Sequence, residues 1–481
     1  MALPAFPYLL EPVFTMWWTM MWPRQTCYWP STGPICTVPA HTWPAYRFFG
    51  IRTDYCQATR LCDEHAKPVH VQGCEPVLFF MFKRHAARYP EEEDAKIFEK
   101  NLSRLRDAIV NAYERNQTRL CGDIADALRE WAYDYEDEKT GQITDVGRTT
   151  AALIGTRYQK RFPTLLPRKF SKDEYHLQFT SRIRTQQTAE AFMNAIIDKQ
   201  GNETITDWGE PNDSLVQFHQ HCNKRLKEFK GYKKEALREK EAFPNTSAVR
   251  IMLKVIRQRL GINVTFDDTR SMVKFCSFET ALNKTSPFCA LFQREDFQIF
   301  EFYDDINDYY RDAYAHSRNY KQSCPMVNEL RKRLLSSKDY YRNNGTEEGR
   351  PLKAVLYFSH GGGFKKLVAR FGLFKDYKNI RGNDYCYLKK HRKWRSSFVN
   401  PFSANLVFVL LKCKDDFFVL TYLHEKSVIV QGCWGYICPL DQFLRSPALR
   451  QAQYDCDMGQ ICIPTPNEGG YETPQRGSAS E

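Results

Sequence analysis

The sequence predicts an α/β fold that carries an inserted α-helical cap. Three segments share one plan, in which a short apolar or β-branched run ends in a basic residue and a helix-like pattern follows. Two long stretches of helical periodicity, rich in charged residues, separate these segments. With 481 residues, the chain is too long for one small core but long enough for one large α/β domain with an inserted subdomain.

The first segment is an apolar run that stops at a cluster of basic residues. The run PVLFFMFKRH predicts a buried strand that ends at His85, and His85 stands in sequence between Arg84 and Arg88. A proline and the four acidic residues 91–94 follow. The predicted strand therefore delivers two arginines and a histidine to one place.

The second and third segments repeat this plan. A strand near 175–179 leads to Arg184 and then to a helix. A strand through Phe358 leads to His360 and then to a helix from about Phe364. In open α/β sheets, ligands bind beyond the carboxyl ends of the strands, so we expect the three strand ends to share one site.

The remaining segments complete the predicted organisation. The α/β domain is assigned to residues 50–94, 136–205 and 342–462, and the helical cap to residues 95–135 and 206–341. In the cap, the run SAVRIMLKVIRQRLG ends at Gly261, which suits a helix C-terminus. The run FFVLTYLHEKSVIV predicts a hairpin whose turn lies near 424–426.

The two ends of the sequence differ in character from the rest. Residues 1–26 are a candidate signal peptide, because VFTMWWTMMW has the length of a signal-peptide apolar region, although no lysine or arginine precedes it. The same run is too short for a stable membrane span. The composition of residues 463–481 predicts a disordered tail without an ER-retention signal.

Cysteine usage and glycosylation motifs favour the secretory pathway. None of the sixteen cysteines forms a C-x-x-C motif, which disfavours zinc ribbons and thioredoxin-like sites and favours disulfides; scattered buried thiols are the alternative. Three short-range pairs are candidates: Cys56 with Cys62, Cys433 with Cys438, and Cys456 with Cys462. Eight N-x-S/T sequons add to this interpretation: Asn101, Asn116, Asn202, Asn212, Asn245, Asn263, Asn283 and Asn344.

The basic strand ends indicate chemistry on a phosphate group. Arginine presents a planar fork of donors that matches two oxygens of a phosphate, and a neutral histidine has a lone pair that can attack phosphorus. Arg84, His85, Arg88, Arg184 and His360 would together form a pocket for a tetrahedral dianion with a nucleophile at its floor. The alternative is a solvated basic loop and one core histidine. The formal net charge of +12 favours anionic ligands in general.

These motifs resemble a known family. RHAARYP is similar to the RHGxRxP signature of the histidine acid phosphatases, RTQQTAEAF to their second arginine segment, and SHGGGFKKLVARFGLFKD stands in the place of their H-D or H-A-E segment. FCSFETALNKTSPFC, YYRDAYAHSRNYKQSC, KKHRKWRSS and NPFSANLVFVL resemble, in order, the multiple inositol polyphosphate phosphatase branch. The likeness runs from about Cys74 to Cys462.

The resemblance implies a fold, an activity and a set of site residues. The fold is a histidine-phosphatase-like mixed sheet flanked by helices with a helical cap, and the activity is hydrolysis of inositol-phosphate monoesters through a phosphohistidine. His85 matches the nucleophile, His360 a second catalytic residue, and Arg84, Arg88 and Arg184 the phosphate-binding groups. The family's lumenal setting agrees with the sequons, and without the family's ER-retention tail we expect secretion or another endomembrane lumen.

Two positions depart from the family pattern. Ala86 replaces the glycine of RHG, which would cost on the order of 1 kcal/mol if that position needs positive φ. Gly362 stands where the family carries its acidic proton donor, and a positioned general acid is typically worth about 100-fold to 10,000-fold in rate. If only this acid is missing, Gly362→Glu should raise turnover at least about tenfold.

Further candidates surround these positions. The backbone N–H groups of Gly362 and Gly363, with Lys365 nearby, are candidate phosphate ligands, and a flexible loop with solvated lysines is the alternative. The acids at 91–94 are candidate substitutes for the missing donor, or simply favour a helix N-terminus. The run KKHRKWRSS is interpreted as a charged surface loop, with contacts to peripheral phosphates as the alternative.

Two functions of different classes follow from this pattern. The leading hypothesis is a phosphomonoesterase acting on inositol polyphosphates or another phosphomonoester, with activity reduced by the change at Gly362. The alternative is a catalytically degenerate pseudophosphatase that binds inositol phosphates or other polyanions. No cofactor and no metal site is predicted. No nucleic-acid partner is predicted either, because no motif for reading or stacking bases is present.

Overall fold

The computed structural model describes most of the chain between Cys27 and Ile463. The described residues are 27–28, 33–36, 44–62, 65–134, 139–198, 209, 211–220, 222, 234–343, 345–346 and 349–463. The candidate signal peptide, the sequons at Asn202 and Asn344, and the predicted tail beyond residue 463 lie outside this part of the chain. Within it, no helix combines the length and the apolar character that crossing a bilayer requires.

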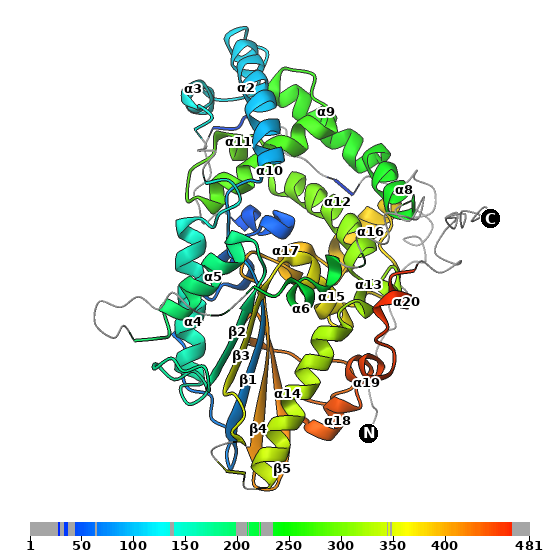
Figure 1. Ribbon diagram of the computed structural model, residues 1–481. Helices are drawn as coiled ribbons and strands as arrows, with labels where there is room; N and C mark the ends of the chain where they lie inside the picture. Colours follow the sequence, from blue (N-terminus) through cyan, green and yellow to red (C-terminus); the bar gives the residue numbers. More distant parts are fainter. Residues whose placement is uncertain are drawn as a thin grey trace, which may run out of the picture.

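A mixed β-sheet forms the centre of the α/β domain, as predicted (Figure 1). The strands are hydrogen-bonded in the order β2-β3-β1-β4-β5-β6, and β7 also pairs with β5. The pairs β1–β3 and β2–β3 are parallel, whereas β4 runs antiparallel to β1. The strands are β1 (Glu75–Arg84), β2 (Tyr175–Phe179), β3 (Ala354–Ser359), β4 (Asn405–Cys413), β5 (Asp416–Leu423), β6 (Lys426–Ser427) and β7 (Ile437–Pro439).

The register of the parallel strands aligns their carboxyl ends. Arg84 of β1 pairs with Ser359 of β3, and Phe179 of β2 pairs with Phe358 of β3. Since parallel strands run in one direction, these three ends lie at the same edge of the sheet. The predicted strands at 175–179 and through Phe358, and the buried strand that ends before His85, are therefore present and adjacent.

Both faces of the sheet are covered by helices, which explains why the β1 run is apolar without alternation. Phe79 and Met81 pack in a core with residues of α4 (Asp145–Arg161) and α5 (Ile183–Asn194). Phe80 and Phe82 pack on the opposite face, in a second core. Its helices include α14 (Cys324–Arg342), α15 (Gly361–Arg370), α18 (Leu440–Leu444) and α19 (Pro447–Tyr454).

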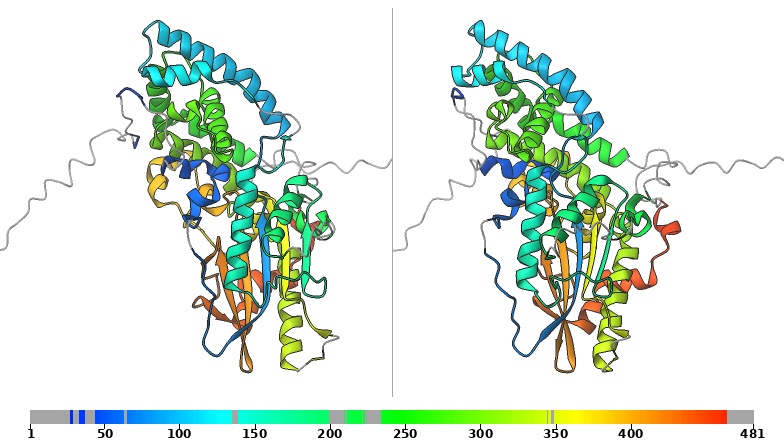
Figure 2. Two further views of the ribbon diagram at one scale, coloured as in Figure 1. Left: turned by 90° about the vertical axis from the view of Figure 1, so that its left-hand side faces the viewer. Right: turned by 60° about the vertical axis from the view of Figure 1, so that its left-hand side comes forward.

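The helical cap stacks on the carboxyl edge of the parallel strands, and Figure 2 shows this stacking from two sides. Its helices are α2 (Glu92–Glu114), α3 (Gly122–Glu130), α8 (Lys234–Ala242), α9 (Ser247–Leu260), α10 (Phe266–Ala281), α11 (Pro287–Ala290), α12 (Arg294–Asp312) and α13 (Ser317–Lys321). Helix α9 buries Val249, Met252 and Ile256 on one face and ends at Gly261, whose φ is +68°. A Cβ at Gly261 would lie 2.6 Å from the carbonyl oxygen of Gln117, so both backbone conformation and space require glycine there.

Short helices connect the cap and the sheet. Figure 1 shows α6, α15 and α17 at this junction. The short elements are η2 (Pro44–Phe48), η3 (Gly50–Arg52), α1 (Tyr55–Thr59), α6 (Asp213–Val216), η5 (Phe243–Asn245), η7 (Gly382–Asp384), α16 (Tyr385–His391), α17 (Ser396–Val399) and α20 (Met458–Ile461). The predicted boundary at 341 groups α14 with the cap, whereas α14 lies along the sheet: Tyr357 of β3 donates to Glu329 of α14 at 3.1 Å.

All sixteen cysteines are paired in eight disulfides. Cys56–Cys62 and Cys433–Cys438 confirm two predicted pairs. The predicted pair of Cys456 with Cys462 is wrong, because these residues bond to distant partners in the fold instead of to each other. The remaining disulfides are Cys27–Cys386, Cys36–Cys121, Cys74–Cys413, Cys222–Cys462, Cys276–Cys289 and Cys324–Cys456.

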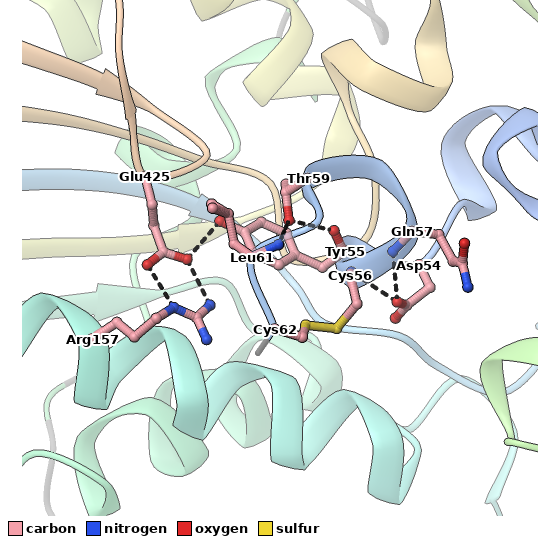
Figure 3. The surroundings of a disulfide bond; sticks show 9 residues. All are labelled: Asp54, Tyr55, Cys56, Gln57, Thr59, Leu61, Cys62, Arg157 and Glu425. Carbon is pink, nitrogen blue, oxygen red and sulfur yellow. Dashed lines mark hydrogen bonds and ion pairs between the residues drawn. A yellow bond between two sulfur atoms is a disulfide. The ribbon is translucent and has the colours of Figure 1, made fainter. Parts of the chain in front are cut away.

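The predicted hairpin is confirmed, and its turn is tied to the core by buried polar contacts. His424 and Glu425 form the turn between β5 and β6, with φ of +49° and +64°. Glu425 accepts two hydrogen bonds from Arg157 of α4, at 2.7 and 2.8 Å, and one from the Tyr55 hydroxyl at 2.9 Å (Figure 3). Tyr55 belongs to α1, beside the Cys56 disulfide, so this ion pair joins α1, α4 and the hairpin.

Replacing Glu425 with alanine should leave the Arg157 guanidinium buried without its carboxylate. Because removing one partner of a buried pair leaves an uncompensated charge, we expect the free energy of unfolding to fall by about 3–5 kcal/mol. Urea denaturation followed by fluorescence measures this loss. As a control, Asp198→Ala breaks an ion pair with Arg168 whose side chains are 63% and 60% exposed, and should cost less than about 1 kcal/mol. Equal losses in the two variants would contradict the buried role of Glu425.

Candidate active site

The predicted site residues lie at the carboxyl edge of the parallel strands. Arg84 is the last residue of β1, and His360 is the N-cap of α15 directly after β3. The rings of His85 and His360 have centroids 5.6 Å apart. Arg88 and Arg184 both approach one oxygen of Glu91, with N···O distances of 3.5 and 3.1 Å. The fold therefore brings together all five residues that the sequence selected from three distant segments.

His85 is held as a neutral ring with one nitrogen available. Its Nδ1 lies 2.9 Å from the carbonyl oxygen of Ala86, and because a carbonyl only accepts, Nδ1 carries the hydrogen and Nε2 keeps its lone pair. Burial, followed by the charges of Arg84 and Arg184, holds the pKa of His85 well below its ordinary value of 6.5. The histidine at the strand end is thus an uncharged imidazole with a ring nitrogen that keeps its lone pair.

Ala86 fits the backbone without strain. Among the described residues other than glycine, those with positive φ do not include Ala86. Its N–H donates to the Thr188 hydroxyl at 3.0 Å, and its fully buried side chain packs in a small cluster with Ile143, Ala151 and Ala191. The cost considered for a positive φ at this position therefore does not arise.

The three arginines carry buried donors that a ligand could use. The Nε atoms of Arg84, Arg88 and Arg184 are buried and have no hydrogen-bond partner in the part of the chain that the structure describes. Burial, then the charge of Arg88, lowers the pKa of Arg84 to about 9. A buried donor without a partner costs about 1–3 kcal/mol, and a bound oxyanion would remove this cost.

The Arg84 side chain is fixed in place by the neighbouring loops. Its Nη1 donates to the carbonyl oxygens of Ile51 and Asn400, both at 2.6 Å. Its guanidinium lies 4.8 Å from the centroid of the Phe402 ring. These contacts leave the Nε edge of a rigid guanidinium without a protein partner among the described residues.

His360 is anchored through one ring nitrogen only. Its Nε2 lies 2.9 Å from the Thr180 hydroxyl at the end of β2. Its Nδ1 is buried, and no described residue hydrogen-bonds to it. Burial, followed by Arg184 and His219, holds the pKa of His360 well below 6.5. The ring is therefore a neutral polar group beside His85.

The three glycines after His360 form the first turn of α15, which begins at Gly361 and not near Phe364 as expected. A Cβ at Gly361 would lie 2.5 Å from Nδ2 of Asn400, so a side chain at this position would have to displace the Asn400 amide. A Cβ at Gly362 would lie 3.0 Å from Cδ2 of His219, and one at Gly363 3.3 Å from Nδ1 of the same ring. His219 thus occupies space that a side chain at 362 would need.

The neighbouring lysines are engaged with carboxylates of α12. Lys365 forms ion pairs with Asp308 and Asp312 at 2.6 and 2.8 Å, and Lys366 with Asp312 at 2.6 Å. Both lysines are almost fully buried. Their charges balance two carboxylates in the protein core, so the pairing accounts for Lys365 without a phosphate.

The acidic run after the signature also has local partners. Glu91 lies between the guanidinium groups of Arg88 and Arg184, as described above. Glu92 is exposed and pairs with Lys96, and Asp94 pairs with Lys274. Of these acids, Glu91 alone contacts arginines of the candidate site in the described structure, and it is ion-paired to both.

The surface-loop interpretation of KKHRKWRSS is wrong for its second half. Arg392 and Trp394 are buried, and Arg392 pairs with Glu301 at 2.7 Å and with Asp305 at 2.8 Å. Arg395 also pairs with Glu301, at 2.7 Å. Charge runs usually face solvent, but here two acids of α12 supply the partners that make burial possible.

A cavity beside His360 contains residues that sequence reasoning did not select. Its volume is about 530 Å³, and its walls include Arg182, Arg184, Asp213, Gln217, His219 and His360. Asn400 is a further buried group near Arg84, and neither polar atom of its side chain has a partner among the described residues. Asn400 opens the motif NPFSANLVFVL, but nothing in that motif marks it as a site residue, and His219 stands in no motif. Both residues reach the site only through tertiary packing.

The site combines a neutral histidine with basic residues at the edge of a mixed sheet, under a helical cap. This combination is typical of the phosphatases that act through a histidine. The chain belongs to the histidine phosphatase superfamily (branch 2), whose family model matches residues 80–424. This match confirms the family that the sequence motifs resemble.

Three known proteins illustrate the relationship. Multiple inositol polyphosphate phosphatase 1 of Drosophila melanogaster is 27% identical over 388 residues, which cover 76% of this chain and 78% of that protein. The crystal structure of the phytase from D. castellii has a TM-score of 0.60 at 16% identity and covers 87% of both chains. The multiple inositol polyphosphate phosphatase of Bifidobacterium longum, in complex with inositol hexasulfate, has a TM-score of 0.53 at 14% identity, covering 81% of this chain and 95% of that one. The two solved structures share the fold.

The lowered pKa of His85 makes a prediction about its charge. In the unfolded chain a histidine gains its proton near pH 6.5, whereas in the folded protein His85 should stay neutral from pH 7 to well below pH 6.5. Nitrogen NMR of histidine-labelled protein, assigned by the signal lost in His85→Ala, should show the Nδ1–H tautomer across this range. The same titration in urea provides the reference. Protonation of His85 near pH 6 would contradict the desolvated site.

Proposed function

We propose that this protein is a secretory-pathway histidine phosphatase that hydrolyses phosphomonoesters of inositol polyphosphates through a phosphohistidine. The observation that carries the proposal is the neutral His85 ring, with Nε2 free, beside three arginines whose Nε donors lack described partners. Relatives named multiple inositol polyphosphate phosphatase, and the structure of one with inositol hexasulfate, support the substrate class.

The proposal gives each group a role in the first step, and the geometry of the site supports these roles. Nε2 of His85 attacks phosphorus, and the bond from phosphorus to the inositol oxygen breaks. Arg84, Arg88 and Arg184 donate to the equatorial oxygens of the transferring group, with His360 as a further donor or acceptor beside them. In the second step a water oxygen attacks the phosphohistidine, and inorganic phosphate leaves with His85 restored.

The backbone N–H groups of Gly362 and Gly363 complete the proposed phosphate site. They lie in the first turn of α15, where N–H groups have no partner within the helix and the helix dipole favours an anion. The buried Nδ1 of His360, unpaired within the described chain, lies at the N-cap of the same helix. We do not include Lys365 in this set, because Asp308 and Asp312 hold its ammonium group.

The disulfides support a secreted or lumenal location. Eight disulfides require an oxidising compartment to form and persist. Among the sequons within the described residues, those at Asn116, Asn245, Asn263 and Asn283 are exposed, where a glycan can be attached. The proposal therefore places the substrate outside the cytosol.

A non-catalytic polyanion-binding protein is the second candidate function. The observation in its favour is Gly362, which has no side chain where the related enzymes are expected to carry an acid. Phosphate binding depends on the arginines and should survive this change better than turnover does. Binding and turnover must therefore be measured on the same glycosylated protein.

The decisive experiment follows phosphate release from inositol hexakisphosphate. We expect turnover by the wild type and a loss of at least about 1,000-fold in His85→Ala, because the nucleophile is gone. Brief mixing with labelled substrate should trap phosphate on the wild-type protein and not on this variant. His176→Ala, which removes a histidine at the second position of β2, away from the carboxyl end of the strand, is the matched control and should retain activity. Calorimetric binding without phosphate release or a trapped intermediate would select the non-catalytic function.

A further inference from the structure

His219 is the side chain that fills the space beside Gly362. It belongs to the helical segment 218–220, directly after α6, and so comes from the cap half of the sequence. Its Nε2 lies 3.2 Å from the position that a Cβ at residue 362 would take. A glutamate carboxyl oxygen lies about 3 to 4 Å from its own Cβ by ordinary covalent geometry. The imidazole therefore reaches the region in which an acid at 362 would act.

The surroundings of His219 are those of the phosphate site. It lines the cavity of about 530 Å³ together with His360 and Arg184. Its side chain is buried, and its Nδ1 has no hydrogen-bond partner among the residues that the structure describes. A buried histidine without such a partner is costly, and no structural hydrogen bond of the described chain explains its place.

Other acids near the cavity are less suited to donate a proton. Asp213 also lines the cavity, but it accepts hydrogen bonds from the N–H and hydroxyl of Ser181 and from Gln217, at 2.6–2.9 Å. Burial raises its pKa, but these hydrogen bonds outweigh burial and lower the pKa of Asp213 below its ordinary value. Glu91 is ion-paired to two arginines of the site, and Asp308 to Lys365.

We propose that His219 is the general acid of this enzyme and supplies the leaving-group proton that a glycine at position 362 cannot. This inference rests on the proposed phosphatase function. It assigns the role to a residue 143 positions away from Gly362 in sequence, because the absent side chain leaves room for the imidazole.

The proton balance of the reaction follows from this assignment. As Nε2 of His85 bonds to phosphorus, the bond to the leaving oxygen breaks, and the Nε2–H proton of the His219 imidazolium moves to that oxygen. The products are a neutral alcohol, neutral His219 and a phosphorylated His85. In the second step, neutral His219 accepts a proton from the attacking water, inorganic phosphate is released, and the imidazolium is restored.

The charges around His219 set the pH at which it can act. Burial, then Lys366, lowers the pKa of His219 to about 4, with Lys365 and Arg311 acting in the same direction and Asp312 opposing them. His360, directly after β3, lines the same cavity as His219. Because kcat/KM reports the free enzyme, kcat/KM for alkyl phosphates should fall about tenfold per pH unit above pH 4.

The test compares substrates that differ in their need for a proton. The leaving group of inositol hexakisphosphate is an alkoxide that must be protonated, whereas 2,4-dinitrophenyl phosphate releases a stable phenolate. For His219→Ala and His219→Gln we expect kcat/KM to fall at least about 100-fold with the first substrate and less than about threefold with the second. The fall of kcat/KM above pH 4 should disappear in both variants. His176→Ala is the control for loss of a histidine elsewhere on the sheet.

A second pair of variants tests whether a glutamate at position 362 can take over the role of His219. Gly362→Glu alone should not raise turnover tenfold, because its Cβ would lie 3.0 Å from the His219 ring. The double variant Gly362→Glu with His219→Ala removes that contact, and we expect it to recover at least about tenfold of the activity lost in His219→Ala. Circular dichroism and thermal melting confirm that each variant is folded.

The possible outcomes separate this inference from the proposed function. Equal losses on both substrates would indicate a structural role for His219 and overturn the inference, while the phosphatase function stands. A leaving-group-dependent loss in Asp213→Asn, with none in His219→Ala, would assign the proton to the carboxyl group instead. A wild type that turns over neither substrate would overturn both proposals.

Discussion

The parallel pairing of β1 with β3 and of β3 with β2 is the constraint on which the rest of the molecule depends. A parallel ladder points its strands in one direction, so residues that follow Arg84, Ser359 and Phe179 must emerge at one edge. Helices cover both faces of the ladder, so its side chains pack into two apolar cores. The cap closes over that edge, so the basic residues are buried rather than solvated.

Burial of positive charge that carboxylates do not fully balance gives the site its chemistry, because Glu91 alone among the described residues pairs with Arg88 and Arg184. Elsewhere in the core, Arg157 is paired with Glu425, and Arg392 with two acids of α12. At the sheet edge, Arg84 donates hydrogen bonds to two carbonyl oxygens and packs over an aromatic ring, with no carboxylate partner among the described residues. Burial lowers its pKa. The same environment keeps His85 neutral. An oxyanion would thus satisfy donors that the described protein leaves unsatisfied and would meet an uncharged nucleophile.

Glycine at 362 illustrates how a change at one position can be compensated from a distant part of the chain. From the family resemblance we expect an acid there, and glycine in its place would remove both a proton donor and the volume of a side chain. The structure places the imidazole of His219 in that volume, on the wall of the same cavity. Catalysis needs a proton donor within reach of the leaving oxygen and does not require that the donor come from a particular segment.

The sequence alone determined the local elements: the strand before His85, the hairpin at His424, the end of α9 at Gly261 and the five basic residues of the site. Periodicity, turn propensity and strand-end position act over a few residues, so they can be recognised without the fold. Only the tertiary structure decided the partners of Cys456, the burial of Arg392 and Lys365, the place of α14 beside the sheet, and the approach of His219 to Gly362. Each of these depends on a contact between distant segments, which forms only when cap and sheet pack against each other.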